Sequence, residues 1–246
     1  MRLHEGFGVQ NFGVAGPPSL NIQVLIMANV LVTGANRGIG LELVKAFCKR
    51  GDTVFAVCRT TNPDLEATNA NVITGVDVTD DALLNVLPRA LEDISLDVVV
   101  LNAGVLSAES LQAPNFDAIR HQFEVNTLGP LRSAIALLPN LKRGTKIGIV
   151  TSRMGSIEDN SSGGMYGYRA SKAAVNAIGR SLAMDLRERG VAVQLLHPGF
   201  VRTDLTRGNG NINADEAART LVQRLDELTL EQTGTFRHQN GEYLPW

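Results

Sequence analysis

Residues 30–40 read Val30-Leu31-Val32-Thr33-Gly34-Ala35-Asn36-Arg37-Gly38-Ile39-Gly40. A short apolar run leads into a glycine-rich turn, after which apolar residues recur at helical spacing as far as Phe47. Gly34 permits a tight turn, and Gly38 and Gly40 let backbone amides at a helix N-terminus approach a phosphate group. The stretch therefore predicts a strand, a phosphate-binding turn and a helix. A Walker-type loop is excluded because no Lys-Ser/Thr pair follows Gly40.

Apolar runs of strand length alternate with amphipathic stretches of helix length along the rest of the chain. We expect strands at residues 29–33, 53–57, 72–76, 97–101, 145–151 and 191–196, and a helix at 169–189. Such alternation is typical of a parallel sheet covered by helices on both faces. The predicted fold is a single-domain α/β Rossmann fold over residues 27–246, with a doubly wound parallel sheet of about seven strands.

The composition excludes several classes of protein. Hydrophobic residues make up 44% of the 246 residues and charged residues 20%, which excludes intrinsic disorder. A formal net charge of -2 gives no reason to expect nucleic acid or an anionic membrane as partner. Cys48 and Cys58 fit neither a disulfide framework nor a zinc site, and the four histidines are scattered. We therefore expect a cytoplasmic protein without a metal.

Residues 1–26 precede the first predicted strand and carry none of the motifs. Four glycines and the pair Pro17-Pro18 would break a helix there. The stretch fits neither a secretory signal nor a mitochondrial presequence, and Met27-Ala28 resembles a second start. We expect this leader to be dispensable or poorly ordered.

Further motifs follow the glycine turn in a fixed order. They are Leu101-Asn102-Ala103-Gly104, Asn126, Ser152, Tyr168-Arg169-Ala170-Ser171-Lys172 and Pro198-Gly199. Together with the GxxxGxG spacing, they resemble the short-chain dehydrogenase/reductase family over residues 29 to about 205, although Leu101 replaces the first Asn of the family's Asn-Asn-Ala-Gly. Arg37 and the C-terminal residues 241–246 are most similar to the sniffer and C-factor type of NADPH-dependent carbonyl reductase.

Tyr168 and Lys172 lie four residues apart at the start of a predicted helix, so both side chains emerge on one face. A free phenol has a pKa near 10, and an ammonium about 4 Å away favours phenolate by up to roughly 4 kcal/mol at an effective dielectric near 20. Lys172 is therefore expected to tune the pKa of Tyr168. A solvated Tyr and Lys on an exposed helix face is the alternative.

The resemblance implies a role for each motif residue. Tyr168 would protonate the carbonyl oxygen of a substrate as hydride arrives from a nicotinamide, and Ser152 would hydrogen-bond the same oxygen. Lys172 would hold the ribose hydroxyls, and Asn126 would anchor a water that relays protons. Ser156 is a rival for the role of Ser152, and a helix-ending cap is the alternative for Asn126.

The cofactor preference depends on the end of the second strand. There the chain reads Cys58-Arg59, where an NAD-preferring enzyme would carry an acid. Arg59 and Arg37 offer guanidinium groups for the 2′-phosphate of NADPH, although either could merely cover the surface. The expected cofactor contacts are Gly34, Asn36, Arg37, Gly38, Ile39, Gly40, Arg59, Asp77, Val78, Asn102, Ala103, Gly104, Tyr168, Lys172, Pro198, Gly199, Val201 and Thr203.

The sequence thus predicts NADPH-dependent reduction of an aldehyde, ketone or quinone to an alcohol. An NAD-linked alcohol dehydrogenase and a dinucleotide-sensing protein without turnover remain alternatives. The physiological substrate stays open because the predicted substrate loop, residues 205–213, is polar and glycine-rich, which indicates mobility. Helices at 128–141 and 169–189 would pair in a homodimer or homotetramer, as in many relatives. The alanines of the second helix fit either that contact or packing on the sheet.

Overall fold

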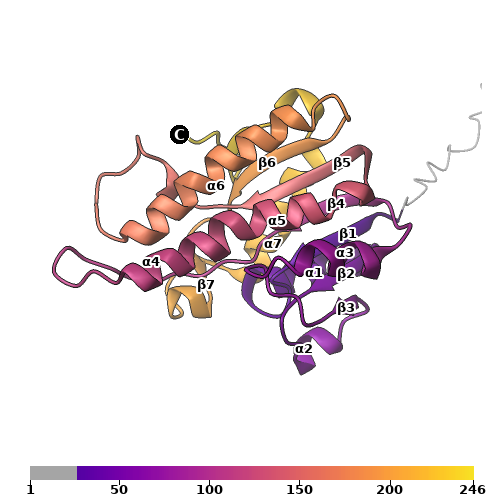
Figure 1. The fold of residues 1–246 in the computed structure, drawn as a ribbon, viewed down its shortest axis with the longest axis horizontal. Helices are drawn as coiled ribbons and strands as arrows, with labels where there is room; N and C mark the ends of the chain where they lie inside the picture. Colours follow the sequence, from indigo (N-terminus) through magenta and orange to yellow (C-terminus); the bar gives the residue numbers. More distant parts are fainter. Residues whose placement is uncertain (1–26) are drawn as a thin grey trace, which may run out of the picture.

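A computed structural model describes residues 27–246, and the expected leader lies outside this range. Seven parallel strands form one sheet in the order β3-β2-β1-β4-β5-β6-β9 (Figure 1). The predicted doubly wound sheet is therefore confirmed. The bounds are β1 (Asn29–Thr33), β2 (Thr53–Val57), β3 (Asn71–Ile73), β4 (Leu96–Leu101), β5 (Leu141–Val150), β6 (Ala192–His197) and β9 (Thr235–His238).

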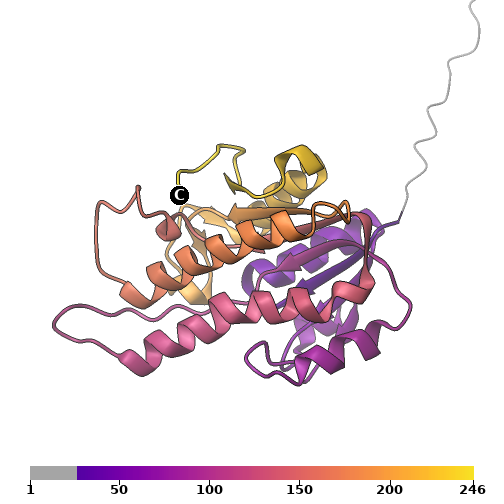
Figure 2. The ribbon, with the colours of Figure 1, turned by 45° about the horizontal axis from the view of Figure 1, so that its top comes forward.

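Helices cover both faces of the sheet. One face carries α1 (Gly38–Arg50) and α7 (Ala214–Glu227), and the other carries α3 (Leu83–Leu91), α4 (Phe116–Phe123), α5 (Gly129–Ala136) and α6 (Tyr166–Asp185). A π-helical turn, η1 (Glu124–Leu128), joins α4 to α5 in one continuous rod, and α6 runs alongside it (Figure 1, Figure 2). The short helix α2 (Pro63–Glu66) follows β2.

Burial on both faces explains the near-continuous apolar strands. Val30, Leu31 and Val32 of β1 are all fully buried, and successive side chains alternate between the two core clusters. On the α1 face, Phe47 is fully buried in the cluster that includes Val30 and Val32. The helix α1 ends at Arg50, and Gly51 follows its two basic last residues in the left-handed region at φ 94°.

The remaining elements are short. Val201–Arg202 (β7) and Ile212–Asn213 (β8) form a two-stranded parallel sheet. Four 3-10 turns complete the structure: η2 (Leu138–Asn140), η3 (Arg153–Gly155), η4 (Asp204–Thr206) and η5 (Leu230–Gln232). Residues 205–213, expected as an irregular loop, are thus partly organised by η4 and β8.

Several predicted boundaries differ from the structure. The third strand ends at Ile73 because the chain turns at Gly75, where φ is +74°. The fifth strand begins at Leu141, four residues before the expected start. The helix expected at 169–189 runs from Tyr166 to Asp185, and the helix expected at 128–141 consists of α5 with parts of its flanking turns. β9 has no counterpart among the predicted strands.

Two features are absent from residues 27–246. No helix there is long and apolar enough to cross a membrane. In the same range, no group of three or more His, Cys, Asp or Glu side chains is placed to hold a metal ion.

Candidate active site

A cavity of about 380 Å³ opens at the carboxyl ends of the strands. Its walls come from the segments that follow β1, β2, β3, β4 and β6, together with the end of β5 and with side chains of α4, η1 and α6. β1 lies between β2 and β4, so the strand order reverses beside this cavity, as expected for a ligand site in an open α/β sheet. The predicted residues that line it are Gly34, Asn36, Arg37, Gly38, Ile39, Arg59, Asp77, Val78, Asn102, Ala103, Gly104, Tyr168, Lys172, Pro198 and Thr203.

The glycine turn is shaped by close backbone approaches. A Cβ on Gly40 would lie 2.1 Å from the main-chain oxygen of Gly34, and a Cβ on Gly34 would lie 2.8 Å from the Cα of Ala103. The helix α1 begins here without a side-chain cap and without an acid in its first turn. Its N-terminal amides are therefore suited to an anionic ligand, and the turn fits the pyrophosphate of a dinucleotide.

Hydrogen bonds fix this turn against the end of β4. The Asn102 side-chain amide donates to the main-chain oxygens of Thr33 and Gly34 at 3.1 and 3.2 Å. The Thr33 hydroxyl accepts the main-chain amides of Asn102 and Ala103 at 3.0 and 3.3 Å. Asn102 therefore joins the two loops that form the floor of the cavity.

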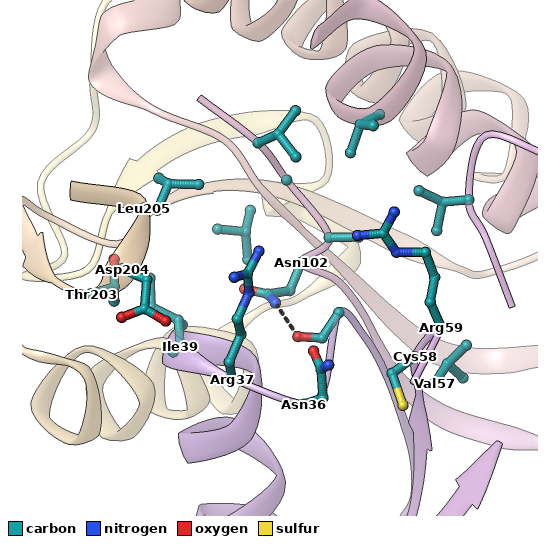
Figure 3. A pocket seen from close by; sticks show the side chains of 18 of the residues that line it. Asn36, Arg37, Ile39, Val57, Cys58, Arg59, Asn102, Thr203, Asp204 and Leu205 are labelled. Carbon is teal, nitrogen blue, oxygen red and sulfur yellow. Dashed lines mark hydrogen bonds between the residues drawn. The ribbon is translucent and has the colours of Figure 1, made fainter. Parts of the chain in front are cut away.

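A pair of asparagines clasps the glycine turn to the loop after β2. The Asn36 side chain donates to the main-chain oxygen of Thr60 at 2.8 Å, and the Asn62 side chain donates to that of Asn36 at 2.6 Å. The clasp sets Arg37 and Arg59 on neighbouring loops, and both guanidinium groups project toward the same cavity (Figure 3).

Arg59 also faces the end of β3. Its guanidinium lies 3.7 Å from the carboxylate of Asp77, and both side chains are solvent-exposed. The pKa of Asp77 is lowered, chiefly by a hydrogen bond from the backbone amide of Thr79 and to a smaller degree by Arg59. An exposed pair of this kind contributes only about 0–1 kcal/mol. Arg59 is therefore free to bind a stronger anion.

Tyr168 and Lys172 are both buried, so the alternative of an exposed pair is wrong. The Lys172 ammonium donates to the main-chain oxygen of Val150 at 3.0 Å and lies 5.8 Å from the centre of the Tyr168 ring. Burial raises the pKa of Tyr168 to about 12, while a hydrogen bond with Ser152 acts in the opposite direction. Burial lowers the pKa of Lys172 to about 8. Burial and Ser152 set the pKa of the phenol, and the expected lowering by Lys172 is not found.

The structure distinguishes the two candidate serines. Ser152 lies two residues after β5, caps η3 by accepting the amide of Met154 at 3.1 Å, and lies near enough to the Tyr168 phenol to lower its pKa. Ser156 donates instead to the main-chain oxygen of Trp246 at 2.9 Å and accepts the amide of Asp159 at 3.1 Å. The geometry thus favours Ser152 as the hydroxyl beside the phenol.

Asn126 lies in the middle of the π-helical turn η1 and does not end a helix. Its side chain accepts the amide of Val105 at 2.8 Å and donates to the oxygen of the same residue at 2.9 Å. It also donates to the Ser171 hydroxyl at 3.1 Å. Asn126 therefore connects the loop after β4 to α6, behind the wall of the cavity.

Some expected contacts do not line the cavity, and other lining residues were not predicted. The expected residues that do not line the cavity are Gly40, Asn126, Ser152, Gly199 and Val201. Leu205 of the predicted substrate loop and Cys58 at the end of the second strand line the cavity as expected, and the lining residues that the sequence did not indicate are Val57, Val76, Val105, His121, Val125, Val150, Thr151 and Asp204. Most of them end or directly follow a predicted strand or motif, and that position is the signal that could have identified them.

Comparison with known proteins identifies the family. A family model described as short chain dehydrogenase matches residues 28–214. The chain belongs to the short-chain dehydrogenase/reductase family, and the predicted family is confirmed. It is an oxidoreductase that acts on the CH–OH/C=O pair with a nicotinamide dinucleotide.

Similar proteins include both dehydrogenases and reductases. The chain is 44% identical over 226 residues to 1-hydroxy-2-glutathionyl-2-methyl-3-butene dehydrogenase of Rhodococcus sp. (strain AD45), covering 89% of this chain and 100% of the relative. The carbonyl reductase Sniffer of D. melanogaster superimposes with a TM-score of 0.80 at 30% identity, over 89% of this chain and 100% of that one. NADPH-bound carbonyl reductase from chicken fatty liver superimposes with a TM-score of 0.81 at 28% identity. The match covers 89% of this chain and 99% of that one.

The depressed pKa of Lys172 predicts a pH dependence of stability. The folded protein releases the Lys172 proton at a pH of about 8, whereas an ordinary lysine keeps it up to 10.5. Between pH 8 and 10.5, Lys172 takes up a proton when the protein unfolds. The free energy of unfolding of the wild type therefore rises with pH in this window, by up to about 3 kcal/mol. Chemical unfolding of cofactor-free wild type and Lys172→Met at pH 7 to 10.5 measures the difference. If the free energies of unfolding of wild type and Lys172→Met change in parallel with pH, the lowered pKa of Lys172 is contradicted.

Proposed function

We propose that the protein is an NADPH-dependent carbonyl reductase that converts an aldehyde, ketone or quinone to an alcohol. The observation that carries the proposal is the buried trio of Tyr168, Ser152 and Lys172, two of which, Tyr168 and Lys172, line a cavity that also contains an uncapped helix N-terminus. A dinucleotide sensor without turnover would not need this trio. Turnover of NADPH with a panel of aldehydes, ketones and quinones tests the proposal.

Tyr168 is the proton donor in this mechanism. With its pKa raised to about 12, the phenol keeps its proton at neutral pH and can donate it to the oxygen of a carbonyl group. The Ser152 hydroxyl, which lies near the phenol and lowers its pKa, would donate to the same oxygen and stabilise the charge that develops there. Reduced nicotinamide supplies the hydride when it is bound. Lys172 would hold the ribose hydroxyls of the cofactor, and Asn126 would anchor a water that returns protons to the site.

Two arginines support the choice of NADPH over NADH. Arg37 and Arg59 project toward one cavity from loops that Asn36 and Asn62 clasp together. A guanidinium group is suited to a phosphate, and two such groups can bind a 2′-phosphate on neighbouring oxygens. Solved structures similar to this chain are described with bound NADPH or NADP.

A second candidate function uses the same residues in the opposite direction. The Rhodococcus relative is named as the dehydrogenase of an alcohol that carries a glutathionyl group. Its identity of 44% over its full length favours oxidation of a related alcohol, with Tyr168 as the base. Assays in the oxidative direction with NADP+ and NAD+ distinguish this candidate and the NAD-linked alcohol dehydrogenase from the reductase.

We expect Tyr168→Phe to fold normally, to bind NADPH with near-wild-type affinity and to lose turnover by about 10²- to 10⁴-fold. The substitution keeps the buried ring and removes only the hydroxyl that delivers the proton. Tyr166→Phe, on the same helix but exposed, is the matched control. Steady-state kinetics and NADPH titration measure the effect, and near-normal turnover of Tyr168→Phe would rule out this proton donor.

We expect Arg59→Ala to weaken NADPH binding by roughly 10- to 150-fold and to leave NADH binding nearly unchanged. The reason is that hydrogen bonds to a charged group contribute about 1.5–3 kcal/mol. Arg120→Ala, an exposed arginine of α4 paired only with Asp117, is the control. Titration with both cofactors checks the expectation, and an equal loss for both would refute the 2′-phosphate role.

We also propose that α6 pairs with its copy in a homodimer or homotetramer. Ala170 and Ala177 are exposed on this helix and Ala173 and Ala174 are half-buried, so a face of small residues is left open beside the sheet. Light scattering should give a mass at least twice 26.4 kDa at micromolar concentration, and Ala177→Arg should reduce it. A wild-type mass of 26.4 kDa would contradict the assembly.

A further inference from the structure

Glu109 is a buried carboxylate that the proposed mechanism does not use. It lies in the loop between β4 and α4 and is only 5% exposed. Its two oxygens accept hydrogen bonds from neutral donors on two different helices: Gln122 Nε2 of α4 at 2.5 Å and the main-chain amide of Gly167 in α6 at 3.2 Å. Burial of a carboxylate is costly unless its hydrogen bonds are made.

The carboxylate supplies a cap that the sequence near α6 does not provide. Met165 precedes this helix in the left-handed region at φ 52° and makes no side-chain cap. Glu109 compensates from a distance, because its Oε2 accepts the Gly167 amide and its main-chain oxygen accepts the Met165 amide at 3.2 Å. A negative charge near a helix N-terminus is stabilised by the helix dipole. The capped turn contains Tyr168.

Gln122 completes the network. Its Oε1 accepts the main-chain amide of Ser107 at 3.0 Å, so three donors meet three acceptors among Ser107, Glu109, Gln122 and Gly167. The helices approach closely at this point, since a Cβ on Gly167 would lie 2.5 Å from Gln122 Nε2. Only a side chain with two acceptor oxygens at position 109 satisfies both of its donors while Gln122 keeps its bond to Ser107.

A second set of hydrogen bonds joins the same loop and helices one helical turn further along each helix. Gln122 and Asn126 are four residues apart on the α4–η1 rod, and Gly167 and Ser171 are four residues apart on α6. Asn126 joins Val105 of the loop to Ser171, just as Gln122 and Glu109 join the loop to Gly167. Tyr168 lies between the two sets, so its backbone is held from both sides.

We propose that Glu109 is a positioning residue that fixes the first turn of α6, and with it Tyr168, relative to the loop after β4. This inference rests on the proposed role of Tyr168. The chemistry requires the Tyr168 hydroxyl to reach one substrate oxygen, and small displacements of a reacting group cost large factors in rate.

Exchange of the two side chains provides the sharpest test. Glu109→Gln removes one acceptor and adds a donor, so one backbone amide loses its partner. Gln122→Glu alone places two carboxylates face to face. The double variant Glu109→Gln/Gln122→Glu restores three donors and three acceptors. The carboxylate at position 122 accepts the main-chain amide of Ser107 and the side-chain NH₂ of residue 109, and the side-chain oxygen of residue 109 accepts the main-chain amide of Gly167.

We expect Glu109→Gln to lower kcat by about 10- to 100-fold with the KM for NADPH unchanged within about twofold, and the double variant to recover most of the loss. Asp117→Asn, an exposed acid of α4 that is 94% exposed, is the matched control and should keep wild-type kcat. Wild-type kcat in Glu109→Gln, or no recovery in the double variant, would overturn the proposal. If Glu109→Gln does not fold, Glu109→Asp should still lower kcat several-fold at constant KM, and wild-type kcat would overturn it.

Hydrogen–deuterium exchange gives a readout that does not depend on turnover. We expect the amide of Gly167 to exchange at least about tenfold faster in Glu109→Gln and at the wild-type rate in the double variant. Unchanged exchange in Glu109→Gln would overturn the proposal. Failure of the wild type to reduce any carbonyl with NADPH would contradict the proposed function instead, while the exchange result would still decide the role of Glu109 in fixing the helix.

Discussion

The close approach of the β1–α1 turn to the end of β4 is the constraint on which the rest of the site depends. Gly40 has no room for a Cβ against the oxygen of Gly34, and the Asn102 side chain donates to the main-chain oxygens of Thr33 and Gly34 at the start of the turn. This contact places the uncapped N-terminus of α1 beside the loop that continues to Val105. Asn126 then holds Val105 and reaches Ser171 on α6. One chain of contacts thus leads from the glycine turn to the helix that carries Tyr168, the proposed proton donor.

The site contains buried polar groups, and their burial lowers the stability of the fold. The proposed mechanism uses several of these groups. Lys172 is 4% exposed and its pKa is lowered by burial, so its charged form is held at a free-energy cost. Tyr168, Asn126 and Glu109 are likewise buried, but each has its hydrogen bonds made by neighbouring loops and helices. A buried network that is fully bonded is rigid, and rigidity is what proton delivery to a single oxygen requires.

Most of the fold was predictable because its signals are local. The glycine turn and the apolar strands predicted a doubly wound sheet, and six of its seven strands were anticipated with shifts of a few residues. β9 was missed because its residues, Thr235–His238, alternate weakly at a sheet edge. The choice between Ser152 and Ser156 needed a contact with Trp246, ninety residues away. The phenol pKa and the role of Glu109 depend on burial and on tertiary bonds, which no local spacing reveals.

We infer that the cavity binds NADP(H) with the nicotinamide beside Tyr168 and the 2′-phosphate beside the two arginines. A crystal structure of the complex with NADP+ tests it most directly. We expect the pyrophosphate at the N-terminus of α1, the 2′-phosphate within hydrogen-bond distance of Arg37 or Arg59, and the nicotinamide ribose at Lys172. A dinucleotide bound in the reverse direction, or a nicotinamide ring away from Tyr168 with the 2′-phosphate in solvent, would contradict it.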